Sequence, residues 1–83
     1  MYYVYILQSG KTGHYYVGST GHLEDRIERH NGGRSKATKN GLPWTLVFKE
    51  AYSNRGEAMR REMEIKGWKS HERISAMINT YRL

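Results

Sequence analysis

The stretch Tyr2–Gln8 constrains the fold of this 83-residue chain more than any other segment. Its aromatic and β-branched residues are typical of a β-strand, whose alternate side chains point to opposite faces of a sheet. The two faces would carry Tyr3, Tyr5 and Leu7 on one side and Tyr2, Val4 and Ile6 on the other. Because both faces are apolar, we expect this segment to be the central strand of a sheet.

The length of the chain and its lack of cysteine limit what else it can build. A chain this short cannot support two hydrophobic cores, so we expect one domain over residues 1–83. With no cysteine, neither a disulfide framework nor a cysteine-ligated zinc ion can reinforce it. The N-terminus has no basic lead and no long apolar run, so we expect no signal peptide, no membrane span and a cytoplasmic location.

Turn and capping residues indicate a hairpin and a first helix after this strand. Ser9–Gly13 supplies turn residues, and residues 14–19 form a second short strand that would pair antiparallel with the first. Thr20 can cap a helix over residues 22–31, which the run Asn31-Gly32-Gly33 ends.

Similar signals predict a third strand and two further helices. Residues 44–52 follow Pro43 and alternate, with Trp44, Leu46 and Phe48 on one face. Asn54 opens a helix over residues 55–67. The last helix is indicated by a capping residue and by apolar spacing: Ser70, then Ile74, Met77, Ile78 and Tyr81. The chain is therefore predicted to be α+β, in the order β-β-α-β-α-α, with a three-stranded sheet packed against helices.

The net charge of +6 indicates a polyanionic partner, and nucleic acid is the first candidate. Half of this excess lies in the glycine-rich segment 32–43, which carries Arg34, Lys36 and Lys39 and no acidic residue. A basic, flexible loop can contact a phosphate backbone, but a solvated loop with incidental cations has the same composition.

Two polar side chains fall inside the apolar stripe of the first predicted helix. At about 100° per residue, Arg26 and His30 share an arc with Leu23 and Ile27. One interpretation is a partly buried histidine bonded to a backbone carbonyl, beside an arginine at the edge of the core. The other is a functional pair.

Glu62 presents the same ambiguity on the second predicted helix. It lies at the centre of an arc formed by Ala58, Met59, Met63, Ile65 and Lys66. A carboxylate that faces a core needs a cationic partner. Glu62 therefore either forms an ion pair with Lys66 four residues on, or serves as a metal ligand at the floor of a cleft.

Taken in order, these residues resemble the GIY-YIG nuclease domain over essentially the whole chain. The resemblance rests on Tyr3-Val4-Tyr5, Tyr16-Val17-Gly18, Arg26, His30 and Glu62. The stretches YYVYILQS, YYVGST, HNGG, PWTLVF and AMRREMEIKGW are similar to the small stand-alone GIY-YIG proteins of bacteria, of the UPF0213 kind. The resemblance implies a central three-stranded antiparallel sheet flanked by helices, with a metal-dependent phosphodiesterase site on that sheet.

Phosphodiester hydrolysis gives each of these residues an expected role. Glu62 would bind Mg²⁺ or Mn²⁺, and Arg26 would hold a phosphate oxygen and stabilise charge in the transition state. Tyr5 would be the general base if nearby cations lower its pKa, with Tyr16 as an orienting or relay group and His30 as its partner. Lys66 and Lys69 are expected to contact backbone phosphates together with the cations of segment 32–43, although Lys66 could instead neutralise Glu62.

The chain departs from the family pattern at two positions. Tyr3 stands where the first motif has a glycine, which changes backbone packing but not the catalytic tyrosine. Family members often carry an asparagine after the metal-binding glutamate, and the only downstream candidate here is Asn79 on the last helix. Gly18 would keep the sheet surface open for a nucleic-acid backbone, although a glycine at a strand end needs no functional reason.

We therefore expect a metal-dependent nucleic-acid hydrolase, similar to a DNA endonuclease, that acts as a monomer with weak sequence preference. DNA is favoured over RNA as its substrate, no membrane is expected to take part, and a protein partner could supply specificity. The alternative is a DNA- or RNA-binding module on the same fold that turns over poorly or not at all. A third idea is a structural domain whose basic face binds an acidic protein.

Overall fold

A three-stranded antiparallel sheet organises the molecule, and the computed structural model describes residues 1–81 of it. The strands are β1 (Tyr2–Ser9), β2 (Tyr15–Thr20) and β3 (Trp44–Tyr52), in the spatial order β2-β1-β3. Three α-helices and one 3₁₀-helix complete it: α1 (Leu23–Asn31), η1 (Lys39–Gly41), α2 (Arg55–Trp68) and α3 (His71–Thr80). The α+β class, the order of the elements and the central position of β1 are confirmed.

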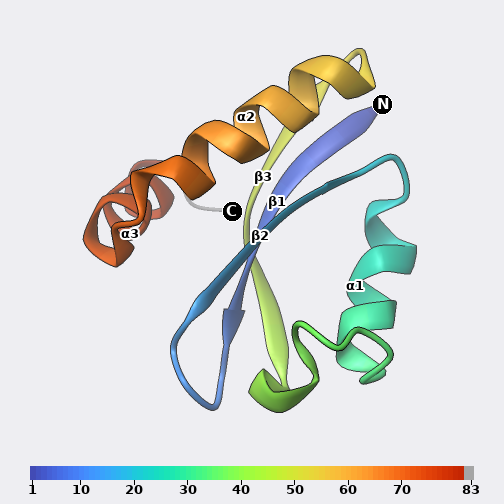
Figure 1. Ribbon diagram of the computed structural model, residues 1–83, viewed down its shortest axis with the longest axis vertical. Coiled ribbons are helices and arrows are strands. Elements are labelled where there is room, and N and C mark those ends of the chain that lie inside the picture. Colours follow the sequence, from blue (N-terminus) through green and yellow to red (C-terminus); the bar gives the residue numbers. More distant parts are fainter. Residues whose placement is uncertain (82–83) are drawn as a thin grey trace.

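Helices lie on both faces of the sheet (Figure 1). The apolar side chains on both faces of β1 are therefore buried. On one face, α2 and α3 enclose a core formed by Val4, Ile6, Val17, Phe48, Ala58, Ile65, Ile74 and Ile78. On the other face, α1 and the segment that follows it cover a smaller core of Tyr5, Leu7 and Trp44, against which Leu23 and Ile27 pack. The two cores therefore share one strand, and the expectation that so short a chain cannot support two hydrophobic cores was wrong, because β1 buries residues on both of its faces.

A β-bulge in β3 changes which face each of its side chains occupies. Ile6 pairs with Phe48, but the next residue of β1, Leu7, pairs with Leu46, so Val47 has no partner in the ladder. An extra residue reverses the alternation of a strand. Trp44 and Leu46 therefore pack on the α1 face while Phe48 packs on the opposite face, and the prediction that all three share a face was wrong.

The two C-terminal helices begin at the predicted capping residues, whereas α1 does not. The Asn54 side chain accepts a hydrogen bond from the Glu57 amide, and the Ser70 side chain accepts one from the Arg73 amide. These bonds satisfy amides that a helix N-terminus leaves without a partner. Thr20 instead accepts from the amide of His22, the actual N-cap of α1, so its hydroxyl shapes the turn before the helix.

The basic segment 32–43 is folded onto α1 and β3 rather than free. It contains η1, and its Thr38 is fully buried. Trp44 Nε1 donates to the Thr38 carbonyl oxygen at 2.7 Å, and Ser9 Oγ donates to the Gly41 carbonyl oxygen at 2.5 Å. These buried bonds anchor the segment, which corrects the expectation of a flexible loop.

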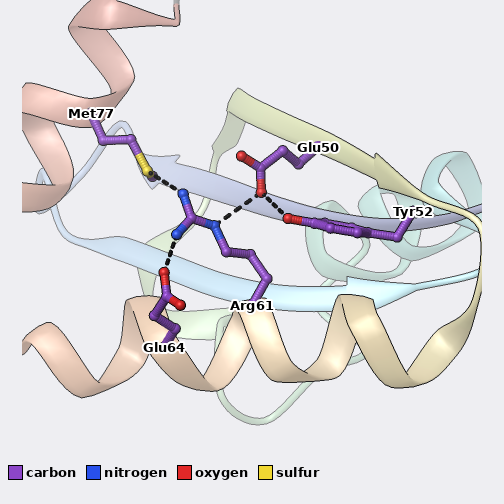
Figure 2. Close-up of polar contacts among 5 residues, drawn as sticks. All are labelled: Glu50, Tyr52, Arg61, Glu64 and Met77. Carbon is purple, nitrogen blue, oxygen red and sulfur yellow. Dashed lines mark hydrogen bonds and ion pairs between the residues drawn. The ribbon is translucent and has the colours of Figure 1, made fainter.

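Arg61 on α2 points toward β3 and α3 (Figure 2). Its guanidinium donates to Glu50 Oε1 at 3.0 Å, forms an ion pair with Glu64 and lies 3.5 Å from Met77 Sδ. The Tyr52 hydroxyl donates to the same Glu50 oxygen at 2.7 Å. Because Arg61 turns its own face of α2 toward β3, only part of the apolar arc predicted around Glu62 is buried.

Ala58 and Ile65 face the core, whereas Met59 and Met63 are 44% and 70% exposed.

Within residues 1–81, no helix is both long enough and apolar enough to cross a membrane.

Candidate active site at the edge strand

Tyr5 lies across Gly18 of the neighbouring strand. The two residues pair in the sheet, and a β-carbon built at position 18 would lie 2.5 Å from the Tyr5 hydroxyl oxygen. Any side chain there would clash, so the tyrosine ring needs a glycine at this position. The structure thus gives Gly18 a packing role, beyond the open surface that was expected of it.

A chain of hydrogen bonds runs from Tyr5 into the interior. The Tyr5 hydroxyl lies 3.0 Å from His30 Nε2, and His30 Nδ1 lies 2.8 Å from Thr38 Oγ1. His30 is 2% exposed, and the Tyr16 ring packs against it with the ring centroids 4.8 Å apart. His30 is therefore a buried histidine, as one interpretation held, but its partners are two side chains and not a backbone carbonyl.

Burial keeps both members of the Tyr5–His30 pair uncharged at neutral pH. It raises the pKa of Tyr5 to about 12, with a smaller contribution from Tyr16, while the charge and hydrogen bonding of Arg26 oppose the shift. Burial and the charges of Arg26 and Arg29 lower the pKa of His30. A neutral imidazole has one ring N–H, so when Nδ1 donates to Thr38, Nε2 accepts the Tyr5 proton.

Two hydrogen bonds position Glu62 beside β2, on the α2 face of the sheet and not on the α1 face that holds Tyr5. Ser19 Oγ donates to Glu62 Oε1 at 2.5 Å, and Lys66 Nζ donates to Glu62 Oε2 at 2.5 Å. The Glu62 side chain is 18% exposed, compared with 51% for Lys66. The predicted ion pair between Glu62 and Lys66 is therefore present. The hydrogen bond from Ser19 in addition holds the Glu62 carboxylate at the edge of the sheet.

Arg26 and Glu62 belong to different helices, α1 and α2, and both lie near Ser19 of β2. Both charges act on the pKa of Tyr5, Arg26 lowering it and Glu62 raising it, so both groups are within electrostatic range. The structure thus gathers Tyr5, Tyr16 and His30 on the α1 face of the sheet. Arg26 lines the hollow that Ser19 of β2 also lines, and Glu62 is bonded to that serine.

Glu62 is the candidate carboxylate for a divalent cation. Within the described residues 1–81, no three histidine, aspartate or glutamate side chains form a group that could hold a metal ion. Mg²⁺ commonly binds through one or two carboxylates and completes its shell with phosphate oxygens and water. Glu62, oriented by Ser19 and partly open to solvent, fits a cation that is shared with a phosphate.

The predicted phosphate contacts lie on the surface. Arg34 lines a hollow with Arg26 and Arg29, and the acidic Asp25 and Glu28 line the same hollow. The other predicted contacts are also exposed: Lys36, Lys39, Lys66 and Lys69. Asn79 is exposed on α3, the helix that covers the α2 side of the sheet.

Two residues of this site were missed by the sequence analysis. Ser19 directly follows the Tyr16-Val17-Gly18 motif, and strand alternation places it on the α2 face with Val17, which is a usable signal. Thr38 lies in an irregular segment, and its contact with His30 depends on how that segment folds back. Local sequence offers no sign of such a contact.

Comparison with known proteins identifies relatives along most of the chain. Residues 1–75 match the family model described as the GIY-YIG catalytic domain. A UPF0213 protein of Staphylococcus haemolyticus is 42% identical over 74 residues, which are 88% of this chain and 89% of that protein. A UPF0213 protein of Halobacterium salinarum is 39% identical over 67 residues, which are 80% of this chain and 86% of that protein. The solution NMR structure of a UPF0213 protein from Bacillus halodurans is 34% identical, with a TM-score of 0.61 over 96% of this chain and 85% of that one.

Proposed function

The chain belongs to the GIY-YIG catalytic domain family, and from this premise we propose that it hydrolyses nucleic-acid phosphodiester bonds with Mg²⁺ or Mn²⁺. The family is of the nuclease type. One arrangement carries the proposal: Ser19 of β2 is bonded to a carboxylate, Glu62, and lines a hollow with the Arg26 guanidinium, and the same strand borders a buried tyrosine that is bonded to a neutral histidine. These are the groups needed to bind a phosphate, hold a cation and move a proton.

In this proposal Arg26 binds a non-bridging oxygen of the scissile phosphate and stabilises the charge that develops there. Glu62 would hold the divalent cation, with Ser19 fixing the direction of its carboxylate. When bound, such an ion neutralises phosphate charge and lowers the free energy of the transition state. Arg34, Lys36, Lys39, Lys66 and Lys69 would contact neighbouring phosphates.

The raised pKa of Tyr5 shapes its role as general base. A tyrosine with a pKa of about 12 is almost wholly protonated at pH 7, so it does not act as a preformed tyrosinate. Tyr5 can instead pass its own proton to His30 Nε2 while it takes one from the attacking water. The hydroxide then forms the new P–O bond as the bond to the leaving oxygen breaks, and Tyr16 orients the pair.

A second candidate is a nucleic-acid-binding module with little turnover. Two observations favour it: Lys66 neutralises Glu62, and Tyr5 is fully buried in the free protein. In that case the cations would hold a phosphate backbone while the Tyr5–His30–Thr38 chain served only the core.

The replacement Glu62→Gln, measured in a metal-titrated cleavage panel, separates the two candidates. The substrates are duplex, flap, junction and single-stranded DNA and RNA. For a nuclease, the variant loses about 100-fold or more of its Mg²⁺-dependent cleavage but retains salt-sensitive binding. The matched control is Glu64→Gln on the same helix, whose carboxylate pairs with Arg61 instead, and it should cleave like the wild type. Equal cleavage by both variants contradicts the proposal, and binding without cleavage by the folded wild type supports the second candidate.

A further inference from the structure

Helix α2 exposes two methionines that its sequence pattern assigns to the core. Met59 is 44% exposed and Met63 is 70% exposed. They are four residues apart, so they lie on the same face of the helix. Large apolar side chains gathered on one face beside a candidate active site suggest a contact surface rather than an accident of composition.

The fold itself keeps these side chains in solvent. Arg61 ties its face of α2 to Glu50 on β3 and approaches Met77 on α3 (Figure 2). Met63 follows Arg61 by two residues, which at about 100° per residue turns it roughly 160° away. Burying Met63 by rotating the helix would break the bonds of Arg61.

The exposed methionines lie next to the candidate site. Met59 lines the same hollow as Ser19, Arg26 and Arg55. Glu62, bonded to Ser19, falls between the two methionines along the helix. The exposed cations Arg55 and Lys66 lie on the same face, one helical turn before Met59 and nearly one turn after Met63. The helix thus presents a row, cation–methionine–methionine–cation, along the edge of the site.

We propose that Met59 and Met63 contact unpaired nucleobases next to the phosphate at the site, so that this surface binds single-stranded nucleic acid. The inference rests on the proposed function and specifies its substrate class. Phosphates would pair with Arg55 and Lys66, and the bases between them would lie on the thioethers, which are polarizable and pack well against aromatic rings. An intact duplex keeps its bases stacked inside and offers this row only phosphates.

The charge of the row favours this occupant over a second copy of the chain. Two copies meeting antiparallel through this face in a two-fold arrangement would bring Arg55 of each copy near Lys66 of the other, so cations would face cations. The acidic group in the row is Glu62, which is already paired with Lys66 of its own chain. A single strand supplies negative phosphates for the two cations of the row and flat base surfaces for its two methionines.

Methyl NMR on protein carrying ¹³C-ε-methionine tests the proposal without divalent metal. The probes are a mixed-sequence oligodeoxynucleotide of about ten nucleotides and the same sequence closed into a duplex. We expect the Met59 and Met63 methyl signals to shift upfield through base ring currents with the single strand and to stay in place with the duplex. Met77, which contacts Arg61 inside the fold, is the internal reference.

The double variant Met59→Ala/Met63→Ala should bind the single strand roughly tenfold more weakly and the duplex unchanged. The matched variant Met59→Leu/Met63→Leu, which keeps the apolar surface, should stay within about threefold of the wild type. Single-strand binding that leaves both methyl signals unmoved overturns the inference, and so does an equal loss of affinity for the duplex. Because the measurements need no cleavage, failure of Glu62→Gln to reduce activity would contradict the proposed function and leave these results standing.

Discussion

His30 connects three parts of the chain through a single side chain. It belongs to α1, bonds to Tyr5 of β1 and bonds to Thr38 in the basic segment. A charged imidazolium has two ring donors and no acceptor, so it could no longer receive the Tyr5 proton. The neutral state of His30 thus matters both to the core and to the proposed proton path.

The lowered pKa of His30 predicts a loss of stability in mild acid. Unfolded His30 takes up a proton near pH 6.5, whereas folded His30 resists protonation because of burial and the charges of Arg26 and Arg29. The unfolded state therefore binds more protons in this range, and the free energy of unfolding falls as the pH drops below about 6.5 toward the folded pKa.

This prediction can be checked by urea unfolding between pH 7.5 and pH 5, together with an NMR titration of the His30 ring. The variant His30→Gln should show a weaker pH dependence, and the control His14→Gln, in an exposed turn, should follow the wild type. A His30 ring that titrates at or above pH 6.5 in the folded protein would refute the argument.

At the scale of the elements, Arg61 links α2 to the sheet through its guanidinium. Arg61 donates to Glu50 and Glu64 and lies 5.6 Å from the centre of the Trp68 ring, so it joins α2 to β3. Its side chain is 23% exposed, which limits competition from water. These charge-assisted bonds hold the face with Ala58 and Ile65 on the core.

We expect Arg61→Ala to lower the free energy of unfolding by roughly 1–3 kcal/mol, because Glu50 loses a cationic partner in a part-buried position. The neighbouring replacement Arg60→Ala, at an exposed position, should change it by less than about 0.5 kcal/mol. Urea unfolding followed by tryptophan fluorescence measures both. Arg61→Lys should recover only part of the loss, since an ammonium cannot reproduce the guanidinium fork. Equal effects at positions 60 and 61 would contradict this role.

The same helix shows which features can be predicted from sequence. The start of α2 depends on Asn54 and its neighbours, so a local pattern identified it correctly. Its buried face depends on the partners of Arg61, which lie on β3 and α3, and apolar spacing alone therefore placed Met59 and Met63 wrongly. The same distinction separates the central strand β1, evident from its two apolar faces, from the bulge at Val47, which arises only when strands pair.

At the scale of the whole molecule, arginines line two hollows beside α1, one of them where β2, α1 and α2 meet, although Asp25 and Glu28 line the other hollow too. Arg26 and Arg34 line one hollow and Arg55 lines another that Arg26 shares. Binding of a polyanion at such a surface releases condensed counterions, so its affinity falls as salt concentration rises.

We therefore predict a linear decrease of log K with log salt concentration for nucleic acid. Lys36→Gln should reduce the magnitude of that slope by about 0.7 for a single strand, corresponding to one lost phosphate contact. Lys49→Gln is the control, because Lys49 lines a different hollow together with the acidic Glu24 and Asp25. Fluorescence anisotropy over 50–300 mM salt gives both slopes, and a salt-independent affinity would argue against phosphate contacts.

The bulge at Val47 makes the length of β3 part of the architecture. Trp44, which bonds to Thr38 beneath His30, and Phe48, which packs under α2, belong to opposite layers only because one unpaired residue separates their registers. Removing that residue would force one of the two aromatic rings out of its core. Relatives that differ in length should therefore gain or lose residues in the connections between elements. The number of residues from Trp44 to Phe48 should stay the same, because this spacing places the two aromatic rings in their separate cores.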